Sequence, residues 1–213
     1  MKLKALGICG SLRRHSCNAG MLRAAQRLVP AGVSLEIADL SDIPFFNADI
    51  EIMPEPVARV LAQMAEAKCF VFASPEYNFS IAPALKNILD WASRAPDNQL
   101  LADKPVAIMG ARGGIPESPA QRHLMDVCSF LRLRILVTPQ VTANVFGGSF
   151  DARGNLTDRH IALLIREQMN ALAVLCRRRS AKQRPQDHSW QPSRSAPTPP
   201  LPPSGFARPS PAF

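Results

Sequence analysis

The chain has 213 residues, of which 46% are hydrophobic, and a formal net charge of +8. This is enough for one domain of ordinary size with a hydrophobic core. The charge is uneven, because residues 177–213 contain seven basic residues, the single acid Asp187 and nine of the 20 prolines. We therefore expect a folded domain over residues 1–176 and a Pro/Arg-rich disordered tail over 177–213. The basicity belongs mainly to the tail and does not predict nucleic-acid binding by the domain.

The five cysteines are scattered along the chain and have no C-x-x-C spacing. This pattern excludes a disulfide framework and a zinc site, and it favours a reduced, cytoplasmic compartment. No apolar run is long enough to span a membrane, so we expect no membrane partner. The run of prolines within 199–203 could dock an SH3-like partner, but an unstructured extension is the simpler interpretation.

Apolar periodicity predicts strands that alternate with helices. The expected strands cover residues 3–10, 33–38, 69–73, 106–110 and 134–138. The first expected helix includes Met21–Val29. The later helices are expected over residues 55–66, 82–93, 120–131 and 156–176. Residues 40–53 are expected to form a long loop. This alternation predicts an α/β fold, in which helices cover both faces of a five-stranded parallel sheet. Such sheets bind ligands outside the carboxyl ends of their strands, so the turns after the first, third and fourth strands are the most informative.

The turn after the first strand combines a glycine, hydroxyl groups and a cation. Gly10 ends the apolar run, and Ser11, Arg13, Ser16 and Asn18 follow before the first helix. Backbone N–H groups and the helix dipole attract an anion at such a position, and an arginine fork suits phosphate. The turn is neither a P-loop nor a G-x-G-x-x-G fingerprint. We interpret it as a phosphate site; the alternative is that Ser16 or Asn18 only caps a helix.

Two further turns carry candidate site residues. The turn over 74–80 holds the only tyrosine of the chain, Tyr77, in a Pro-led loop with polar neighbours, as a planar ligand with a polar edge would require. The alternative is a surface loop whose tyrosine packs on the end of the sheet. The turn over 111–115 contains Gly113 and Gly114, which permit close backbone approach.

With these turns, the chain resembles the NADPH-dependent FMN reductase family, which includes quinone and chromate reductases. The resemblance covers about residues 3–175 and rests on three segments: Gly10–Arg13 with Ser16 and Asn18, residues 74–78 with 85–91, and residues 110–114. It implies a flavodoxin-like three-layer sandwich with strand order 2-1-3-4-5 and a non-covalently bound FMN. It also implies a homodimer or homotetramer, and places Lys86, Asn87, Asp90 and Trp91 on a helix that supports the site or an interface.

The resemblance also implies the cofactor-binding positions. Ser11, Arg13, Ser16 and Asn18 would bind the FMN phosphate, with Cys17 among them. Pro75, Glu76, Tyr77 and Asn78 would contact the isoalloxazine ring. Arg112, Gly113 and Gly114 would close the other side. Arg112 departs from the family, which usually has a small hydroxyl residue there, so this cation could pair with a phosphate or could block the pocket.

The implied activity is that of an FMN-dependent oxidoreductase. It would take hydride from NADPH or NADH and reduce a small-molecule acceptor, namely a quinone, a flavin, an azo compound or a metal oxyanion. The flavin carries this chemistry, so no catalytic acid or base is needed for the first step. Two alternatives remain: a flavodoxin-type electron carrier, and a flavin-free binding protein on the same fold.

Overall fold

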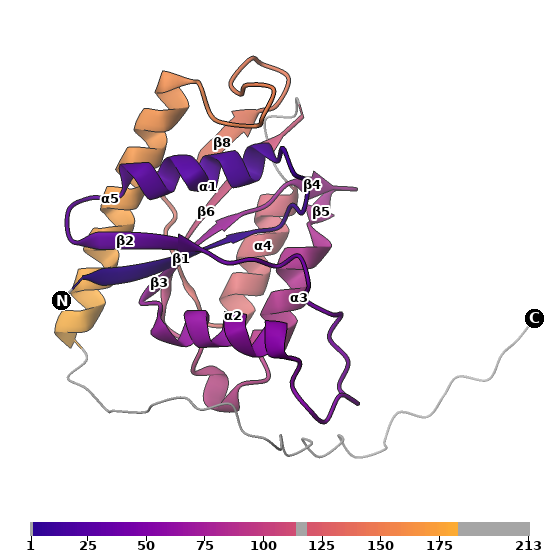
Figure 1. The fold of residues 1–213 in the computed structure, drawn as a ribbon. Coiled ribbons are helices and arrows are strands. Elements are labelled where there is room, and N and C mark those ends of the chain that lie inside the picture. Colours follow the sequence, from indigo (N-terminus) through magenta and orange to yellow (C-terminus); the bar gives the residue numbers. More distant parts are fainter. Residues whose placement is uncertain (1, 114–118, 183–213) are drawn as a thin grey trace, which may run out of the picture.

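The computed structural model describes residues 2–113 and 119–182 and contains a central parallel sheet (Figure 1). Its main strand order is β2-β1-β3-β6-β7, and β8 also pairs with β6. The strands are β1 (Leu3–Cys9), β2 (Val33–Ile37), β3 (Cys69–Ala73), β6 (Pro105–Arg112), β7 (Arg134–Ile135) and β8 (Val141–Asn144). The order β2-β1-β3-β6 with parallel pairing is that of a flavodoxin-like sheet, as expected from the sequence.

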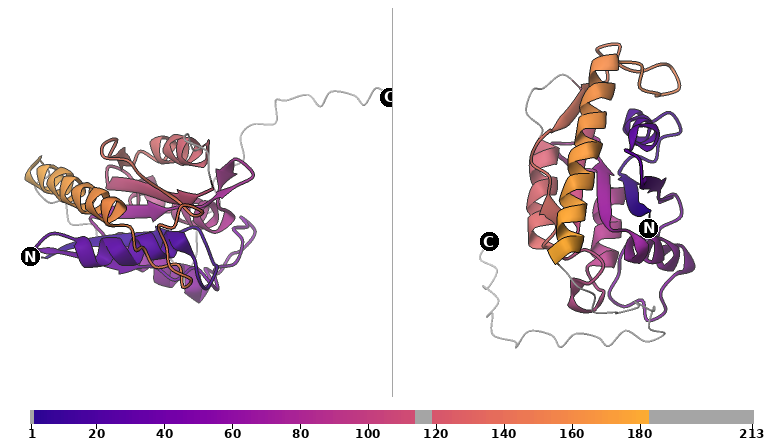
Figure 2. Two further views of the ribbon diagram at one scale, coloured as in Figure 1. Left: turned by 90° about the horizontal axis from the view of Figure 1, so that it is seen from above. Right: turned by 90° about the vertical axis from the view of Figure 1, so that its left-hand side faces the viewer.

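Helices cover both faces of the sheet. The helices are α1 (Cys17–Leu28), α2 (Glu55–Glu66), α3 (Pro83–Ala92), α4 (Pro119–Phe130) and α5 (Arg159–Lys182), and a short 3-10 helix, η1, spans Pro96–Asn98. The helices α1 and α5 share one hydrophobic cluster, and α2, α3 and α4 share the other. Figure 2 shows α5 beside α1 on the same side of the sheet.

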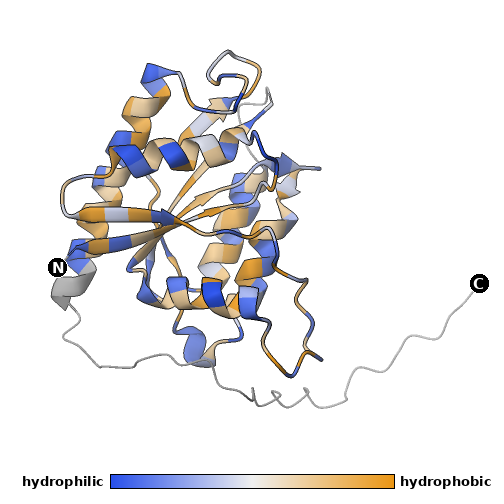
Figure 3. Ribbon diagram, in the orientation of Figure 1, coloured by the Kyte–Doolittle hydropathy of each residue, from blue (hydrophilic) through white to orange (hydrophobic). Residues whose placement is uncertain are grey.

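Alternate residues of each strand enter the two clusters. Phe70 and Phe72 of β3 face α2, α3 and α4, whereas Val71 and Ala73 face α1 and α5. All five residues of β3 are buried, as expected for a strand covered on both faces. Figure 3 shows hydrophobic positions along these central strands, while the helices carry hydrophilic positions on their outer sides.

The expected fifth strand, 134–138, is present but shorter than predicted, since β7 pairs in parallel with β6 over Arg134–Ile135 only and a separate strand, β8, follows. Leu136 still donates a hydrogen bond to the carbonyl of Val106 at 2.8 Å, but β7 itself ends at Ile135 and β8 begins only at Val141. Pro139 between them has no N–H to donate to a ladder. The buried Gln168 of α5 bridges the interruption, since its Nε2 donates to the carbonyls of Ile108 and Pro139 at 3.0 and 2.9 Å.

Two other elements differ from the sequence expectations. Residues 76–81, expected as part of a turn, contain a two-stranded hairpin of β4 (Glu76–Tyr77) and β5 (Ser80–Ile81). The closing helix runs to Lys182, six residues beyond the end expected at Cys176. The rest of the expected tail, 183–213, lies outside the described residues. Within the described residues, no helix is long and apolar enough to cross a membrane.

Candidate functional site

The turns after β1, β3 and β6 lie at one edge of the sheet, because these three strands are neighbours and run in the same direction (Figure 1). The N–H of Gly10 donates to the carbonyl of Ala73 at 2.8 Å, and the N–H of Ser74 donates to that of Met109 at 3.2 Å. A Cβ on Gly10 would lie 2.8 Å from the Cβ of Ala82, so only glycine allows the start of α3 this close to β1. The candidate residues of all three turns therefore share this edge, except Gly114, which lies outside the described residues.

The first turn opens helix α1 with a capping side chain and with the backbone N–H groups of the first helical turn. The Oγ of Ser16 accepts a hydrogen bond from the N–H of Ala19 at 3.2 Å, so Ser16 is the N-cap of α1. The N–H groups of Cys17 and Asn18 lie in the first helical turn, where no intrahelical acceptor exists. Together with the helix dipole, these donors make the turn suitable for an anion.

The charges around this turn also suit an anion. Arg13 is exposed and, within the part of the chain that the structure describes, its guanidinium forms no ion pair or hydrogen bond. The Cys9 thiol donates to the carbonyl of Ser11 at 3.5 Å, and burial raises the pKa of this thiol. Cys9 therefore stays neutral at physiological pH and adds no negative charge beside the turn.

Asn18 links the first turn to the end of β6. Its Nδ2 donates to the carbonyl of Ala111 at 3.0 Å, and its Oδ1 accepts from the N–H of Ala111 at 2.9 Å. Asn18 is only 3% exposed, so these two bonds are made away from water. The two bonds occupy the amide oxygen and one of the two amide hydrogens of Asn18. Asn18 therefore positions the first turn against the end of β6, where the third turn begins.

The second turn presents an exposed aromatic ring on a supported hairpin. Pro75 is buried, and Glu76 accepts a hydrogen bond from the N–H of Ala120 at the start of α4, at 3.3 Å. The Oγ of Ser74 accepts from the N–H of Ala82 at 3.2 Å and donates to the carbonyl of Pro75 at 2.9 Å. Tyr77 is 42% exposed and its neighbour Asn78 is exposed. The ring of Tyr77 is thus available to a ligand.

The third turn contains a buried arginine and an exposed glycine. Arg112, which the sequence leaves either to pair with a phosphate or to block the pocket, is 8% exposed, and its carbonyl accepts from the N–H of Val145 at 2.9 Å. A Cβ on Gly113 would lie 2.8 Å from the ring of Phe146, which is itself 85% exposed, so the third turn lies directly beside the segment that follows β8.

The sequence did not indicate that residues 149–158 pack against the first turn. Gly154 has a φ of +72°, and a Cβ there would lie 2.6 Å from the carbonyl oxygen of His15. Arg23 of α1 donates from Nη2 and Nε to the Oδ1 of Asn155 at 2.8 and 3.2 Å. The local turn could have been recognised from Asp151 and Gly154, but its contact with a segment over 130 residues away could not.

Asp158 fixes the other end of this segment. Its Oδ1 accepts from the N–H groups of His160 and Ile161 at 2.8 and 3.2 Å, and the hydroxyl of Ser149 donates to its Oδ2 at 3.1 Å. The N–H of Ile161, followed by the hydroxyl of Ser149, lowers the pKa of Asp158. The carboxylate therefore remains charged at neutral pH and holds the segment at the start of α5.

The Gly20→Ala variant tests the packing of this segment against α1. Alanine favours a helix over glycine by about 1 kcal/mol. However, a Cβ on Gly20 would lie 1.8 Å from the carbonyl oxygen of Gly154, so the backbone must move. Overpacking costs about 1–3 kcal/mol. We expect urea unfolding to show a net loss of stability; a variant more stable than the wild type would contradict this packing.

A groove of about 480 Å³ lies between β5, α3 and α4, beside the hairpin. Its lining residues come from these three elements: Ser80, Ile81, Pro83, Lys86, His123, Asp126 and Val127. The Oγ of Ser80 lies 3.2 Å from the Nδ1 of His123, which joins the hairpin to α4.

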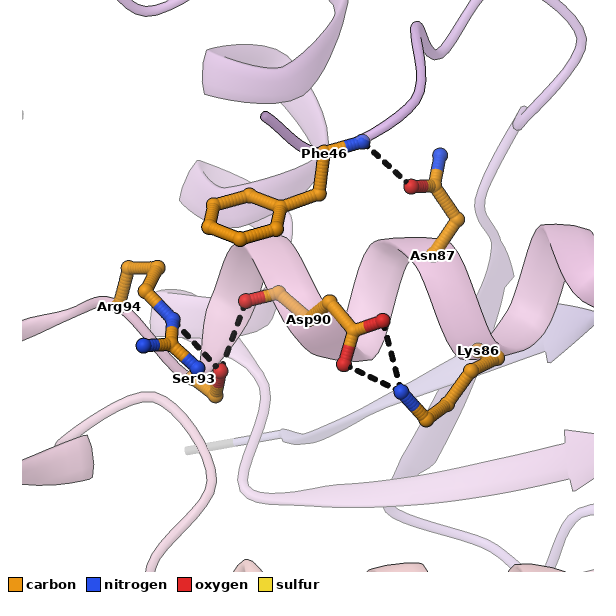
Figure 4. A network of polar contacts seen from close by, with 6 residues as sticks. All are labelled: Phe46, Lys86, Asn87, Asp90, Ser93 and Arg94. Atoms are coloured by element: carbon orange, nitrogen blue, oxygen red, sulfur yellow. Dashed lines mark hydrogen bonds and ion pairs between the residues drawn. The ribbon is translucent and has the colours of Figure 1, made fainter. Parts of the chain in front are cut away.

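Helix α3 supports the 40–53 loop (Figure 4). The Oδ1 of Asn87 accepts from the N–H of Phe46 at 2.8 Å, and the Nε1 of Trp91 donates to the carbonyl of Pro44 at 2.9 Å. Lys86 pairs with both carboxylate oxygens of Asp90, at 2.6 and 2.7 Å. Asn87 and Trp91 therefore brace a loop, and the Lys86–Asp90 pair leaves neither charge free for the groove.

This strand order, with a helix N-terminus and two further turns at the carboxyl edge of the sheet, defines a flavodoxin-like fold. A family model described as NADPH-dependent FMN reductase matches residues 3–147. The chain belongs to this family.

Individual proteins agree with this assignment. An NAD(P)H-dependent FMN reductase of Pseudomonas aeruginosa is 43% identical over 179 residues, which are 83% of this chain and 96% of that protein. An NAD(P)H:quinone oxidoreductase of Solanum tuberosum is 40% identical over 181 residues, covering 81% of this chain and 92% of that protein. The solved structure of FerB, a flavoenzyme NAD(P)H:(acceptor) oxidoreductase from Paracoccus denitrificans, has a TM-score of 0.71 at 24% identity and covers 83% and 98% of the two chains. This likeness shows the shared fold.

Proposed function

We propose that this chain is an enzyme that binds FMN at the carboxyl edge of its sheet, oxidises NADPH or NADH and reduces quinones. The observation that carries the proposal is the meeting of three turns at one edge, with the open N-terminus of α1 at one of them and the exposed ring of Tyr77 at another. Flavins, azo compounds and metal oxyanions are further candidate acceptors of the same site.

The residues present fit FMN. At the first turn, the hydroxyls of Ser11 and Ser16 and the N–H groups of Cys17 and Asn18 are donors for the phosphate, and Arg13 adds a charge. Asn18 contributes mainly by fixing this turn to Ala111. The ring contacts are assigned to Pro75, Glu76, Tyr77 and Asn78, with Arg112, Gly113 and Gly114 on the other side. The burial of Arg112 favours a role within the wall of the site.

Bound FMN would supply the hydride chemistry of the reaction. The chain's own residues would bind the phosphate, orient the ring against the hairpin and keep one face open to the substrates. No acid or base from the chain is assigned to the hydride step, so the hydroxyl, amide and backbone donors at the edge act as binding groups.

NADPH oxidation tests this function. FMN-loaded protein should consume NADPH when 2-methyl-1,4-naphthoquinone is the acceptor, protein stripped of FMN should not, and added FMN should restore the rate. A protein that is reduced only through a separate reductase would be an electron carrier of the flavodoxin type. A protein that binds no flavin would contradict the proposal.

The Tyr77→Ala variant tests the ring contact. We expect faster loss of FMN on dialysis or a changed quinone KM, because an aromatic pair contributes about 0.5–1.5 kcal/mol beyond its buried area. The fold should survive, since Tyr77 is 42% exposed. Circular dichroism and FMN retention are the measurements. Unchanged retention and unchanged quinone kinetics would remove Tyr77 from the site.

We also propose a homodimer or homotetramer in the cytoplasm. The exposed apolar side chains Phe45 and Ile52 of the 40–53 loop support an association surface, and the free state of all five cysteines supports a reducing compartment. Light scattering of the FMN-loaded protein measures the oligomer; a monomeric mass would contradict it.

A further inference from the structure

Phe79, at the tip of the β4–β5 hairpin, occupies an unfavourable backbone conformation. The two residues of the turn, Asn78 and Phe79, have φ values of 51° and 61°, in the left-handed region. Asparagine and glycine are the usual residues at such positions, and for a bulky aromatic residue the conformation is an outlier. Strained residues of this kind persist where surrounding contacts impose the conformation, and they cluster at ligand sites.

Contacts on both sides of the turn hold this conformation. Glu76 before the turn accepts from the N–H of Ala120 at 3.3 Å, and Ser80 after it lies 3.2 Å from His123. Both contacts join the hairpin to α4, so the turn cannot relax without breaking them. Phe79 gains no core packing in return, because it remains 62% exposed. Neither hairpin geometry nor burial accounts for an aromatic residue at this position.

The position of Phe79 suggests what its ring contacts. The hairpin follows β3 at the carboxyl edge, and its other exposed ring belongs to Tyr77, which we assign to the flavin. Building on the proposed function, we propose that Phe79 forms an apolar wall of the acceptor site and makes the enzyme selective for planar quinones. A planar quinone can stack on an aromatic ring, whereas a small hydrated anion gains nothing from it.

The comparison of two acceptors isolates this role. In the quinone reaction, one NADPH gives up a hydride and becomes NADP⁺, and the quinone takes the two electrons and two protons, one of them from water, to form the hydroquinone. In the ferricyanide reaction, the same two electrons reduce two ferricyanide ions and one proton is released. Both reactions use the same NADPH and the same FMN, so a change in their ratio reports on the acceptor site alone.

The test uses the FMN-loaded full chain and the variant Phe79→Gly. We expect the ratio of kcat/KM for 2-methyl-1,4-naphthoquinone to kcat/KM for ferricyanide to fall roughly tenfold, the scale of a lost apolar contact in a binding pocket. Phe79→Tyr keeps the ring and should keep the wild-type ratio. Phe130→Ala is the matched control, because Phe130 is 87% exposed at the far end of α4 and its loss should leave the ratio unchanged.

Two readouts are independent of turnover. Calorimetric titration of the oxidised, FMN-loaded protein with the quinone, without NADPH, should show a weaker dissociation constant for Phe79→Gly than for the wild type. Thermal unfolding should give a higher midpoint for Phe79→Gly than for Phe79→Ala, because only glycine adopts this backbone conformation without strain.

Three results would overturn the role of Phe79: an unchanged acceptor ratio, an equal loss with both acceptors, or a change in oligomeric mass, which would make Phe79 an anchor for a second copy. Failure of the proposed function can be told apart from failure of the role of Phe79. If the proposed function fails, the wild-type chain itself will bind no FMN or will reduce neither acceptor.

Discussion

Replacement of Arg13 by alanine should raise the dissociation constant of FMN by about 10- to 150-fold, because a hydrogen bond to a charged group contributes about 1.5–3 kcal/mol. Arg13 is exposed and forms no ion pair within the described residues, so its guanidinium is available for the phosphate. Fluorescence titration of FMN into stripped protein measures the effect. The thermal stability of the FMN-free protein should not change, since the side chain supports no other contact there.

Arg14 provides the matched control for this prediction. It is the adjacent exposed arginine, and its replacement by alanine changes the net charge of the turn by the same amount. We expect a smaller loss of FMN affinity from Arg14→Ala, which would also shrink at high salt. Equal losses from the two variants would mean that the turn attracts the phosphate only through its overall charge and that Arg13 has no specific place in it.

Replacement of Asn18 by alanine should lower the free energy of unfolding by about 2–6 kcal/mol, since two buried groups are left without a partner at about 1–3 kcal/mol each. Both backbone groups of Ala111 lose a hydrogen bond in this variant. FMN affinity should fall as well, because the first turn is no longer fixed to β6. Urea unfolding of the FMN-free protein separates the two effects.

The exposed Asn47 is the control for Asn18, since its side chain accepts only a local hydrogen bond from Asp49. Asn47→Ala should change stability by no more than about 0.5 kcal/mol. If Asn18→Ala loses FMN affinity but keeps its full stability, Asn18 acts on the phosphate directly and its link to Ala111 is unimportant.

The elements that the sequence predicts well are those with a strong local pattern. Helix α2 and strand β3 have the expected bounds, 55–66 and 69–73, because amphipathic spacing and a continuous apolar run are local signals. The strand expected over 134–138 begins at Arg134 as predicted but ends early, because its interruption depends on Pro139 and on a bond from Gln168, about 30 residues further along the chain. A two-residue strand such as β7 is too short to show the alternation of apolar and polar residues that predicts a strand.

The site shows the same division between local and distant information. The turn after β1 predicts an anion site at the N-terminus of α1, but no local pattern could show that Asn18 binds Ala111, 93 residues away. The contact of Gly154 with His15 was invisible for the same reason. No sequence pattern singles out Phe79, since only its positive φ, which needs coordinates, makes it unusual.

The central claim is that three turns at one edge of the sheet bind FMN and present it to a nicotinamide. The most direct test is the visible spectrum of the purified protein before and after anaerobic addition of NADPH. We predict the absorbance bands of an oxidised flavin in about one equivalent per chain, and their bleaching by NADPH with no other protein present. A colourless protein that takes up no FMN, or a flavin spectrum that NADPH leaves unchanged, would contradict the claim.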